Sequence, residues 1–220
     1  APQALMDTEE TGYADSRELI ETWHKKGRNL YVVTPRFSIT STHGQLITAA
    51  RLHEEFPDTY IQTHLSENKG EIDSTLSLSP ECQDYLEVYE RAGLVTDRSV
   101  FGHCIHLSDS ECRRMAEAGA VIAHCPTSNL FLGSGLFDMQ QVNRIQIRTA
   151  LATDVGGGTS FSLWKTMAES YKVQQLNGYS MSVFESLYKC TRGAAEALKL
   201  DDKIGSFEPG READFIVVDC

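Results

Sequence analysis

The stretch Thr59-Tyr-Ile-Gln-Thr-His64-Leu-Ser-Glu67 joins a short apolar and β-branched run to two polar side chains that follow it. Such a run, bounded by polar residues, is typical of a buried strand. The same arrangement recurs along the chain, and helical stretches separate the repeats. The predicted strands span residues 30–34, 59–64, 99–104, 120–125 and 147–154. Alternation of strands and helices predicts a parallel sheet covered by helices, an α/β fold.

Two capping-box sequences mark helix starts. Thr42-His-Gly-Gln45 opens a helix expected to run to about Phe56, and Ser108-Asp-Ser-Glu111 opens one that ends near Gly119. Further helices are predicted at residues 67–78, 80–92, 138–143, 160–177 and 182–200, with a last strand at 214–219. Strand count alone favours an open doubly wound sheet, because a closed barrel of this type needs eight strands.

Composition restricts the class of protein. The 220 residues are 41% hydrophobic and 23% charged, which is ordinary for a globular chain. A net charge of −11 supplies no broad basic field, so neither nucleic acid nor an anionic membrane surface is an expected partner. No apolar run approaches the ~20 residues of a membrane span, and Ala1-Pro2-Gln3 does not resemble the start of a signal peptide. Six cysteines without a C-x-x-C pair predict reduced thiols and a cytoplasmic location.

A residue capable of chemistry lies at or just beyond the end of each predicted strand: Arg36, His64, His103, His124 and Asp154. The carboxyl ends of parallel strands meet at one edge of a sheet, so these side chains are expected to converge. Histidine and aspartate are ligands suited to zinc or iron. His64 and Asp154 are therefore the candidate metal ligands.

Glu67 lies three residues after His64, close enough to face the same cavity. A metal-bound water needs a base and a leaving group needs an acid, and Asp154 and Glu67 can divide these roles. Arg36 can donate to a carbonyl or carboxylate of a ligand, and Phe37 can stack on a flat heterocycle. Structural alternatives stay open: a helix N-terminal carboxylate for Glu67, a turn former for Asp154 and a surface ion pair for Arg36.

Several motifs are absent from the sequence. Gly156-Gly-Gly158 and Gly133-Ser-Gly135 lack a P-loop lysine, and neither G-x-G-x-x-G nor G-x-S-x-G occurs. The H-x-E and P-C-x-x-C signature of cytidine-type deaminases is missing as well. His106 is expected to be a solvated loop residue, and Cys104 and Cys125 are expected to pack at strand ends. Nucleotide triphosphates, dinucleotides and serine-ester chemistry are disfavoured.

Taken together, the strand-end motifs resemble the amidohydrolase superfamily, in its metal-dependent deaminase branch. The similar stretches are Thr34-Pro-Arg-Phe37, Thr63-His-Leu-Ser-Glu-Asn68, Gly102-His-Cys104, His124-Cys-Pro-Thr-Ser-Asn-Leu130, Thr153-Asp-Val-Gly-Gly-Gly158 and residues 204–214. The first two of these stretches resemble, more specifically, the members that act on guanine. The resemblance implies a TIM-type (β/α)8 barrel, of which residues 1–200 supply strands four to eight. Residues 201–220 would begin the returning segment of a small β-domain.

The same resemblance implies hydrolytic deamination of guanine to xanthine and ammonia by a zinc-activated water. His64 and Asp154 would bind one zinc ion, with iron as the alternative metal. Glu67, His103 and Asp154 would be catalytic, with Glu67 carrying a proton to the purine ring. The substrate would contact these three together with His64, Arg36 and Phe37. No role for His124 follows from the resemblance.

The sequence departs from the family pattern in one respect. Members carry a His-x-His pair on the first barrel strand, and no such pair occurs here. Two ligands are too few for a tight catalytic zinc, so we expect a fragment whose two further ligands lie in a missing N-terminal segment, and which is inactive by itself. Two alternatives remain: a deaminase or chlorohydrolase of another amino-heterocycle, or an assembly-dependent, non-catalytic piece. For the intact protein we expect a homodimer with a small purine as substrate.

Overall fold

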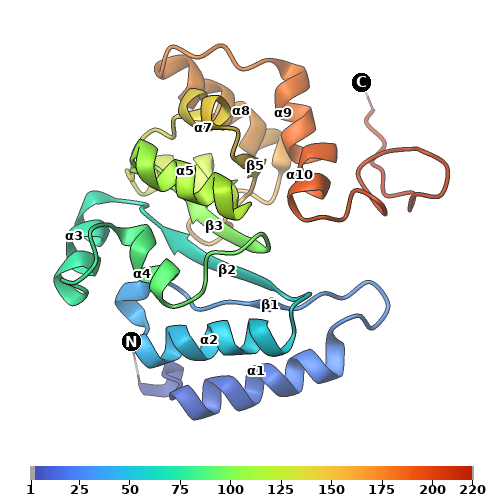
Figure 1. The fold of residues 1–220 in the computed structure, drawn as a ribbon. Coiled ribbons are helices and arrows are strands. Elements are labelled where there is room, and N and C mark those ends of the chain that lie inside the picture. The colour runs from blue at the N-terminus through green and yellow to red at the C-terminus, as the bar shows by residue number, and fades with distance from the viewer. Residues whose placement is uncertain (1–2, 220) are drawn as a thin grey trace.

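Five strands form one parallel sheet in the computed structural model, which describes residues 3–219 (Figure 1). Their order in the sheet is their order in the chain, β1-β2-β3-β4-β5. The bounds are β1 Val32–Val33, β2 Tyr60–Leu65, β3 Ser99–His103, β4 Val121–His124 and β5 Arg148–Leu151. Ala1, Pro2 and Cys220 lie outside the described residues. The predicted parallel α/β sheet is confirmed.

Helices connect and flank the strands. They are α1 Glu9–Trp23, α2 His43–Glu55, α3 Lys69–Leu78, α4 Tyr85–Arg91, α5 Asp109–Ala118, α6 Pro126–Phe131, α7 Met139–Ile145, α8 Leu163–Leu176, α9 Val183–Cys190 and α10 Arg192–Ala197, with 3-10 helices η1 Gln3–Leu5 and η2 Ser38–Thr40. Both predicted capping boxes form: in α2 the Gln45 N–H donates to Thr42 Oγ1 at 3.0 Å, and α5 has the same exchange between Ser108 and Glu111. Sequence reasoning did not anticipate α1 or α6. Within residues 3–219, no helix has both the length and the apolar character needed to cross a bilayer.

Two predicted helices depart most from their expected bounds, and the others differ by at most three residues at either end. The helix expected from residue 80 begins only at Tyr85, because the Asp84 carboxylate accepts the Glu87 N–H at 2.9 Å and caps the helix there. The helix expected over 182–200 is broken at Thr191, where φ −127° and ψ −104° are not helical. The break separates α9 from α10, which packs against β5.

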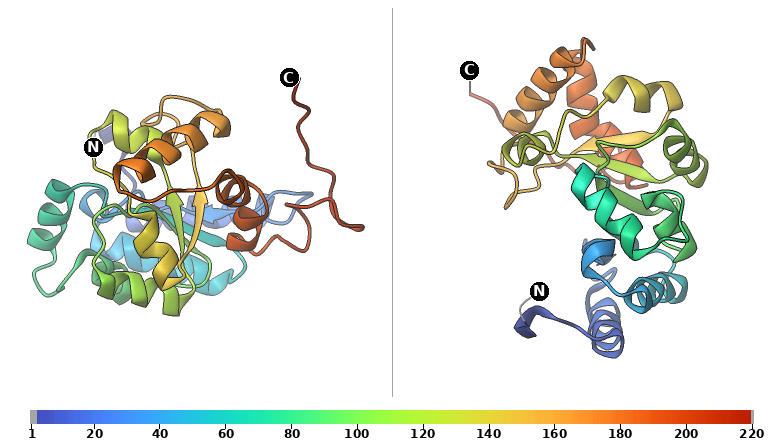
Figure 2. Two further views of the ribbon diagram at one scale, coloured as in Figure 1. Left: turned by 90° about the horizontal axis from the view of Figure 1, so that it is seen from above. Right: turned by 90° about the vertical axis from the view of Figure 1, so that its left-hand side faces the viewer.

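The predicted strand at 214–219 is not formed. Residues 211–219 have no ladder partner in the described chain, and Phe215, Ile216 and Val217 are largely exposed. The segment extends away from the body of the protein (Figure 2, left). A strand needs a partner for its backbone groups, so apolar residues alone do not produce one here.

The core lies between one face of the sheet and helices α2, α4, α5 and α7. Ile61, Leu65 and Phe101 point into it from the strands, and the alternating residues Gln62 and His64 are only half-buried. Each fully buried side chain of this size contributes ~1.5–3 kcal/mol. Beyond this layer, α1 lies outside α2 at one end of the molecule, while α8, α9 and α10 lie at the β5 end (Figures 1 and 2). The other face of β2 thus carries His64, one of the predicted site residues.

Candidate active site

The ends of β2 and β3 bring four predicted residues together. The rings of His64 and His103 stack with centroids 5.1 Å apart and planes 29° apart. Phe37 lies on the other side of His64, with centroids 5.3 Å apart. Nε2 of His103 is 3.7 Å from Oε2 of Glu67. The expected convergence at the carboxyl edge of the sheet is confirmed for these residues.

Hydrogen bonds fix the ring of His64. Its Nδ1 lies 2.7 Å from the carbonyl oxygen of Arg36, and a carbonyl only accepts, so Nδ1 carries the proton. Nε2 then keeps its lone pair, the form in which histidine binds a metal. The same carbonyl accepts from the His64 N–H at 3.2 Å and from Thr63 Oγ1 at 3.1 Å. The exposed Arg36 guanidinium lies over the Phe37 ring, 5.2 Å from its centroid.

His103 is more deeply buried than His64. It is 2% exposed, and its Nδ1 donates to Oδ1 of Asn129 at 2.8 Å. The remaining nitrogen, Nε2, faces Glu67. The backbone of His103 has a φ of +69°, a left-handed conformation that is uncommon outside glycine. Strained backbone at a strand end, held by surrounding contacts, is frequent at functional sites.

The Glu67 carboxylate is free of helix capping. The N-cap of α3 is Asn68, and its partner is Glu71, whose Oε2 accepts the Glu67 N–H at 2.9 Å. Glu71 therefore occupies the structural role considered above for Glu67. The Glu67 carboxylate instead accepts a hydrogen bond from Ser134 Oγ at 2.9 Å and faces His103.

Asp154 follows β5 within a tight turn. Its φ is +46°, and its carbonyl accepts the Gly158 N–H. A Cβ at Gly158 would collide with the carbonyl oxygen of Thr153, so only glycine fits at this position. The glycine run thus lets the chain fold back beside the Asp154 carboxylate.

One group of donor atoms has the spacing of a metal site. Donor atoms of His103, Cys125 and Asp154 all lie within 4.8 Å of one another. Nitrogen, sulfur and oxygen donors of this kind fit zinc. Burial, with a smaller contribution from the Asp154 charge, raises the pKa of Cys125 to about 12, so this thiol is protonated unless a metal binds it. His64 is not in this group, although its ring stacks on His103.

His124 does not take part in the site. It points into the core, where its ring stacks on Phe137 with centroids 4.4 Å apart. It is fully buried, neither ring nitrogen has a hydrogen-bond partner among residues 3–219, and burial lowers its pKa to about 3. Its strand neighbour Ala123, which pairs with Ala150, is half-buried on the opposite face. The expectation that all five strand ends converge is wrong for β4.

Sequence reasoning missed Glu71, Cys125, Asn129 and Ser134. Glu71 completes an Asn-x-x-Glu capping pattern, which was a usable local signal. Ser134 lies 67 residues from Glu67 along the chain, so no local spacing links the two. His106, expected to be solvated, donates from Nε2 to the Ser134 carbonyl at 3.0 Å.

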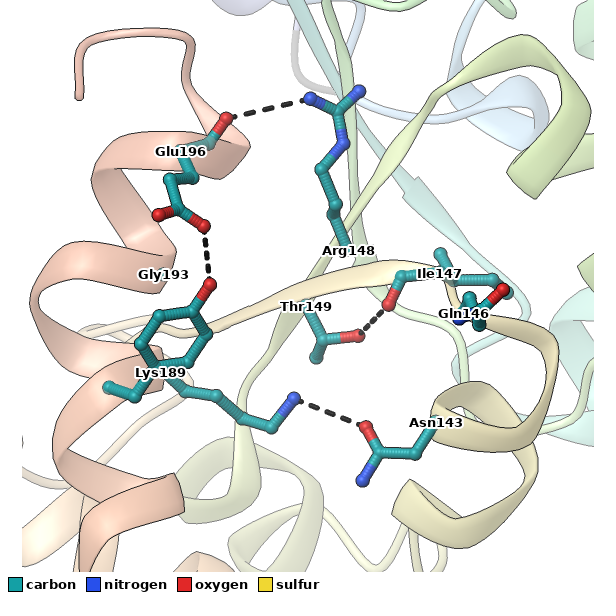
Figure 3. Close-up of a pocket in the computed structure, with 9 residues that line it drawn as sticks. Asn143, Gln146, Ile147, Arg148, Thr149, Lys189, Gly193 and Glu196 are labelled. Atoms are coloured by element: carbon teal, nitrogen blue, oxygen red, sulfur yellow. Dashed lines mark hydrogen bonds between the residues drawn. The ribbon is translucent and has the colours of Figure 1, made fainter. Parts of the chain in front are cut away.

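A separate cavity of about 170 Å³ lies where β5 begins, at the opposite end of that strand from Asp154 (Figure 3). Arg148 and Thr149 of β5 contribute to its wall, with Lys189 of α9 and Glu196 of α10. Lys189 Nζ donates to Asn143 Oδ1 at 3.3 Å across it (Figure 3). None of the predicted site residues lines this cavity.

Comparison with known proteins shows the family of the chain. The sequence model of the amidohydrolase family matches residues 2–220. The chain is 50% identical over 219 residues to the guanine deaminase of Escherichia coli (strain K12), covering 100% of this chain and 50% of that protein. A structure of the E. coli guanine deaminase aligns with a TM-score of 0.96 over 97% of this chain and 50% of that one.

Two further structures are similar. Guanine deaminase from C. acetobutylicum, with bound guanine in the active site, is 30% identical, with a TM-score of 0.87 over 96% of this chain and 51% of that one. An adenosine deaminase from Xanthomonas campestris with bound zinc is 24% identical, with a TM-score of 0.87 over 97% of this chain and 49% of that one, a likeness of fold alone. The chain spans about half the length of the relatives it matches.

Proposed function

The chain belongs to the amidohydrolase family, and we propose that it carries part of the active site of a zinc-dependent guanine deaminase, which converts guanine to xanthine and ammonia. The observation that carries this proposal is the group at the ends of β2 and β3: Glu67 against His103, beside the stacked rings of His64 and Phe37. The 50% identity to a guanine deaminase supports the choice of substrate.

Each residue has a task in this reaction. Phe37 stacks on the flat purine, and the Arg36 guanidinium donates to its carbonyl oxygen. Glu67 moves one proton from the attacking water to the purine ring nitrogen, His103 contacts that water and the substrate, and Asp154 acts as the base that passes the second proton to the leaving ammonia. Zinc, when bound, lowers the pKa of a water molecule so that it can attack at neutral pH.

For the metal, we propose His64 and Asp154 as ligands of one zinc ion, with iron as the alternative. The free Nε2 of His64 supports this choice, and the group of His103, Cys125 and Asp154 offers a second donor set at the same place. A tetrahedral site needs more than two protein ligands. We propose that two further ligands come from the longer protein that carries this chain.

The test is turnover by that longer protein. Loaded with zinc, it should release ammonia from guanine and form xanthine, and Glu67→Gln should lower turnover by about 10²–10⁴-fold. Absence of turnover with zinc bound, or equal turnover of adenine and aminotriazines, would exclude guanine deamination as its function.

Arg36→Ala separates guanine from other amino-heterocycles. Turnover of guanine should fall more than turnover of a substrate without a ring carbonyl, because only guanine loses a hydrogen bond from the Arg36 guanidinium. A deaminase or chlorohydrolase of another heterocycle would show no such difference.

Zinc analysis and an activity assay on the 220-residue chain alone test whether it is inactive by itself, as we propose.

Three further features belong to the proposal. We propose that the longer protein is a homodimer, which light scattering measures. The five cysteines described, at positions 82, 104, 112, 125 and 190, are all free thiols, which supports a cytoplasmic location. Residues 1–200 would form strands four to eight of the barrel, and residues 201–220 would begin a small β-domain.

A further inference from the structure

The turn Gly133-Ser134-Gly135 has no task in the reaction as described, yet it is firmly held. Its glycines have φ values of +70° and +138°, which let the chain reverse after α6. The Ser134 N–H donates to the Asn129 carbonyl at 2.8 Å. On the other side, His106 Nε2 donates to the Ser134 carbonyl at 3.0 Å. Both backbone polar groups of Ser134 are thus fixed, and the residue is 8% exposed.

Its side chain points to the catalytic carboxylate. Ser134 Oγ donates to Glu67 Oε1 at 2.9 Å, while the other oxygen, Oε2, lies 3.7 Å from His103 Nε2. The two carboxylate oxygens are therefore not equivalent. A carboxylate that rotates freely can present either oxygen, whereas a buried hydroxyl donor holds one of them in place.

The chain just before this turn also holds the ring of His103. Asn129 in α6 accepts from His103 Nδ1 through its side chain and from the Ser134 N–H through its backbone. Residues 129–134 thus form one piece that contacts both His103 and Glu67. A displacement of this piece would move both groups at once.

We propose that Ser134 is a positioning residue for the deamination, holding Oε1 of Glu67 so that Oε2 is the oxygen that carries the proton. The inference rests on the proposed function. In the step concerned, Oε2 accepts a proton from the attacking water and gives it to the purine ring nitrogen, and Glu67 returns to a carboxylate. Ser134 keeps its own proton throughout.

The experiment uses the zinc-loaded longer protein and the substitutions Ser134→Ala and Ser134→Thr. Ser134→Ala should lower kcat on guanine by about 10–100-fold, the usual effect of losing a partner that orients an active-site group, with KM nearly unchanged. Ser134→Thr, which keeps the hydroxyl, should recover most of kcat. Ser170→Ala is the matched control, because Ser170 is a buried serine of α8 whose hydroxyl donates to the Met181 sulfur at 3.6 Å rather than to a site residue. A Ser134→Ala kcat within about twofold of wild type would overturn the proposal.

A double-mutant cycle tests whether Ser134 acts through Glu67. In a Glu67→Gln background, Ser134→Ala should change kcat by less than about twofold, because the carboxylate through which Ser134 acts is already gone. Independent effects would instead add, and Ser134→Ala would then lower kcat by the same factor in both backgrounds. Equal losses in both backgrounds would mean that Ser134 acts by another route.

Crystal structures of the wild type and Ser134→Ala give a readout without turnover. The Glu67 carboxylate should rotate or occupy several orientations in the variant. An unchanged orientation would refute the positioning role even if the wild type does not deaminate guanine. If the wild type deaminates guanine and Ser134→Ala has the same kcat, the positioning role is refuted while the proposed function stands.

Discussion

His124 shows how burial, rather than position at a strand end, decides the behaviour of a residue. Its ring is enclosed by the core, and neither nitrogen has a hydrogen-bond partner in the described part of the chain. Burial, with smaller contributions from the nearby Lys189 and His103, lowers its pKa to about 3. Histidine in the unfolded chain titrates near 6.5. Between about pH 6.5 and 3, therefore, the unfolded state binds a proton that the native state does not, and stability falls as the pH falls.

From this we predict that His124→Leu makes the chain less sensitive to acid. Between pH 7.5 and 5, the wild type should lose about 2 kcal/mol more unfolding free energy than the variant. Urea unfolding at each pH measures the difference. His43→Leu, at an exposed position, is the control and should keep the wild-type dependence. Identical pH dependence in wild type and His124→Leu would contradict the prediction.

Asp154 gives a prediction on metal binding. In the longer protein, Asp154→Asn should reduce bound zinc and lower turnover by about 10²–10⁴-fold, because the amide is a poorer ligand and no base. Asparagine tolerates the left-handed backbone of this position, so the turn should survive. Elemental analysis beside a circular dichroism spectrum separates loss of metal from loss of fold. Full zinc content and full activity in the variant would remove Asp154 from the site.

Helix α5 owes its start to a reciprocal cap. The Glu111 N–H donates to Ser108 Oγ at 3.2 Å, and the Ser108 N–H donates to Glu111 Oε2 at 2.9 Å. α5 supplies Cys112 and Met115 to the core, both fully buried. The cap thus sets the position from which these side chains enter the core.

We predict that Ser108→Ala destabilises the chain by about 1 kcal/mol, the usual cost of losing an N-cap side chain. Chemical denaturation followed by circular dichroism measures it. Ser110→Ala is the matched control, since this exposed serine of the first turn caps nothing. Equal effects of the two substitutions would show that the cap contributes little.

At the scale of the whole molecule, the C-terminal segment stands apart from the core. Phe215, Ile216, Val217 and Val218 are between 58% and 86% exposed. Arg28 anchors the beginning of the segment through ion pairs with Glu212 and Asp214. Apolar residues in an extended, unpaired segment favour association with other chains.

The double substitution Ile216→Lys and Val218→Lys should therefore reduce self-association of the 220-residue chain. Its unfolding free energy should change by less than about 0.5 kcal/mol, because exposed side chains away from the core contribute little. Light scattering over a concentration series and urea unfolding provide the two measurements. A large loss of stability would mean that the segment packs on the protein in solution.

Much of the fold followed from local sequence. The parallel α/β order came from short apolar runs alternating with helical stretches, and α2 and α5 came from caps whose partners lie three residues apart. These features act within one turn or one strand, so the sequence determines them directly. The break at Thr191 and the late start of α4 were not anticipated, although the Asp84 cap that starts α4 acts over only three residues.

For the candidate site as well, some features follow from the sequence and others only from the tertiary structure. Sequence by itself determined that Phe37, His64, Glu67 and His103 belong at strand ends, and the resemblance of their motifs pointed to deaminase chemistry. Only the tertiary structure decided which side chains meet. Successive strand residues face opposite sides of a sheet, so a shift of one residue sends a side chain into the core, as at His124. The contacts of Asn129 with His103 and of Ser134 with Glu67 join residues far apart in the chain, and only folding brings residues 129–134 against these strand ends.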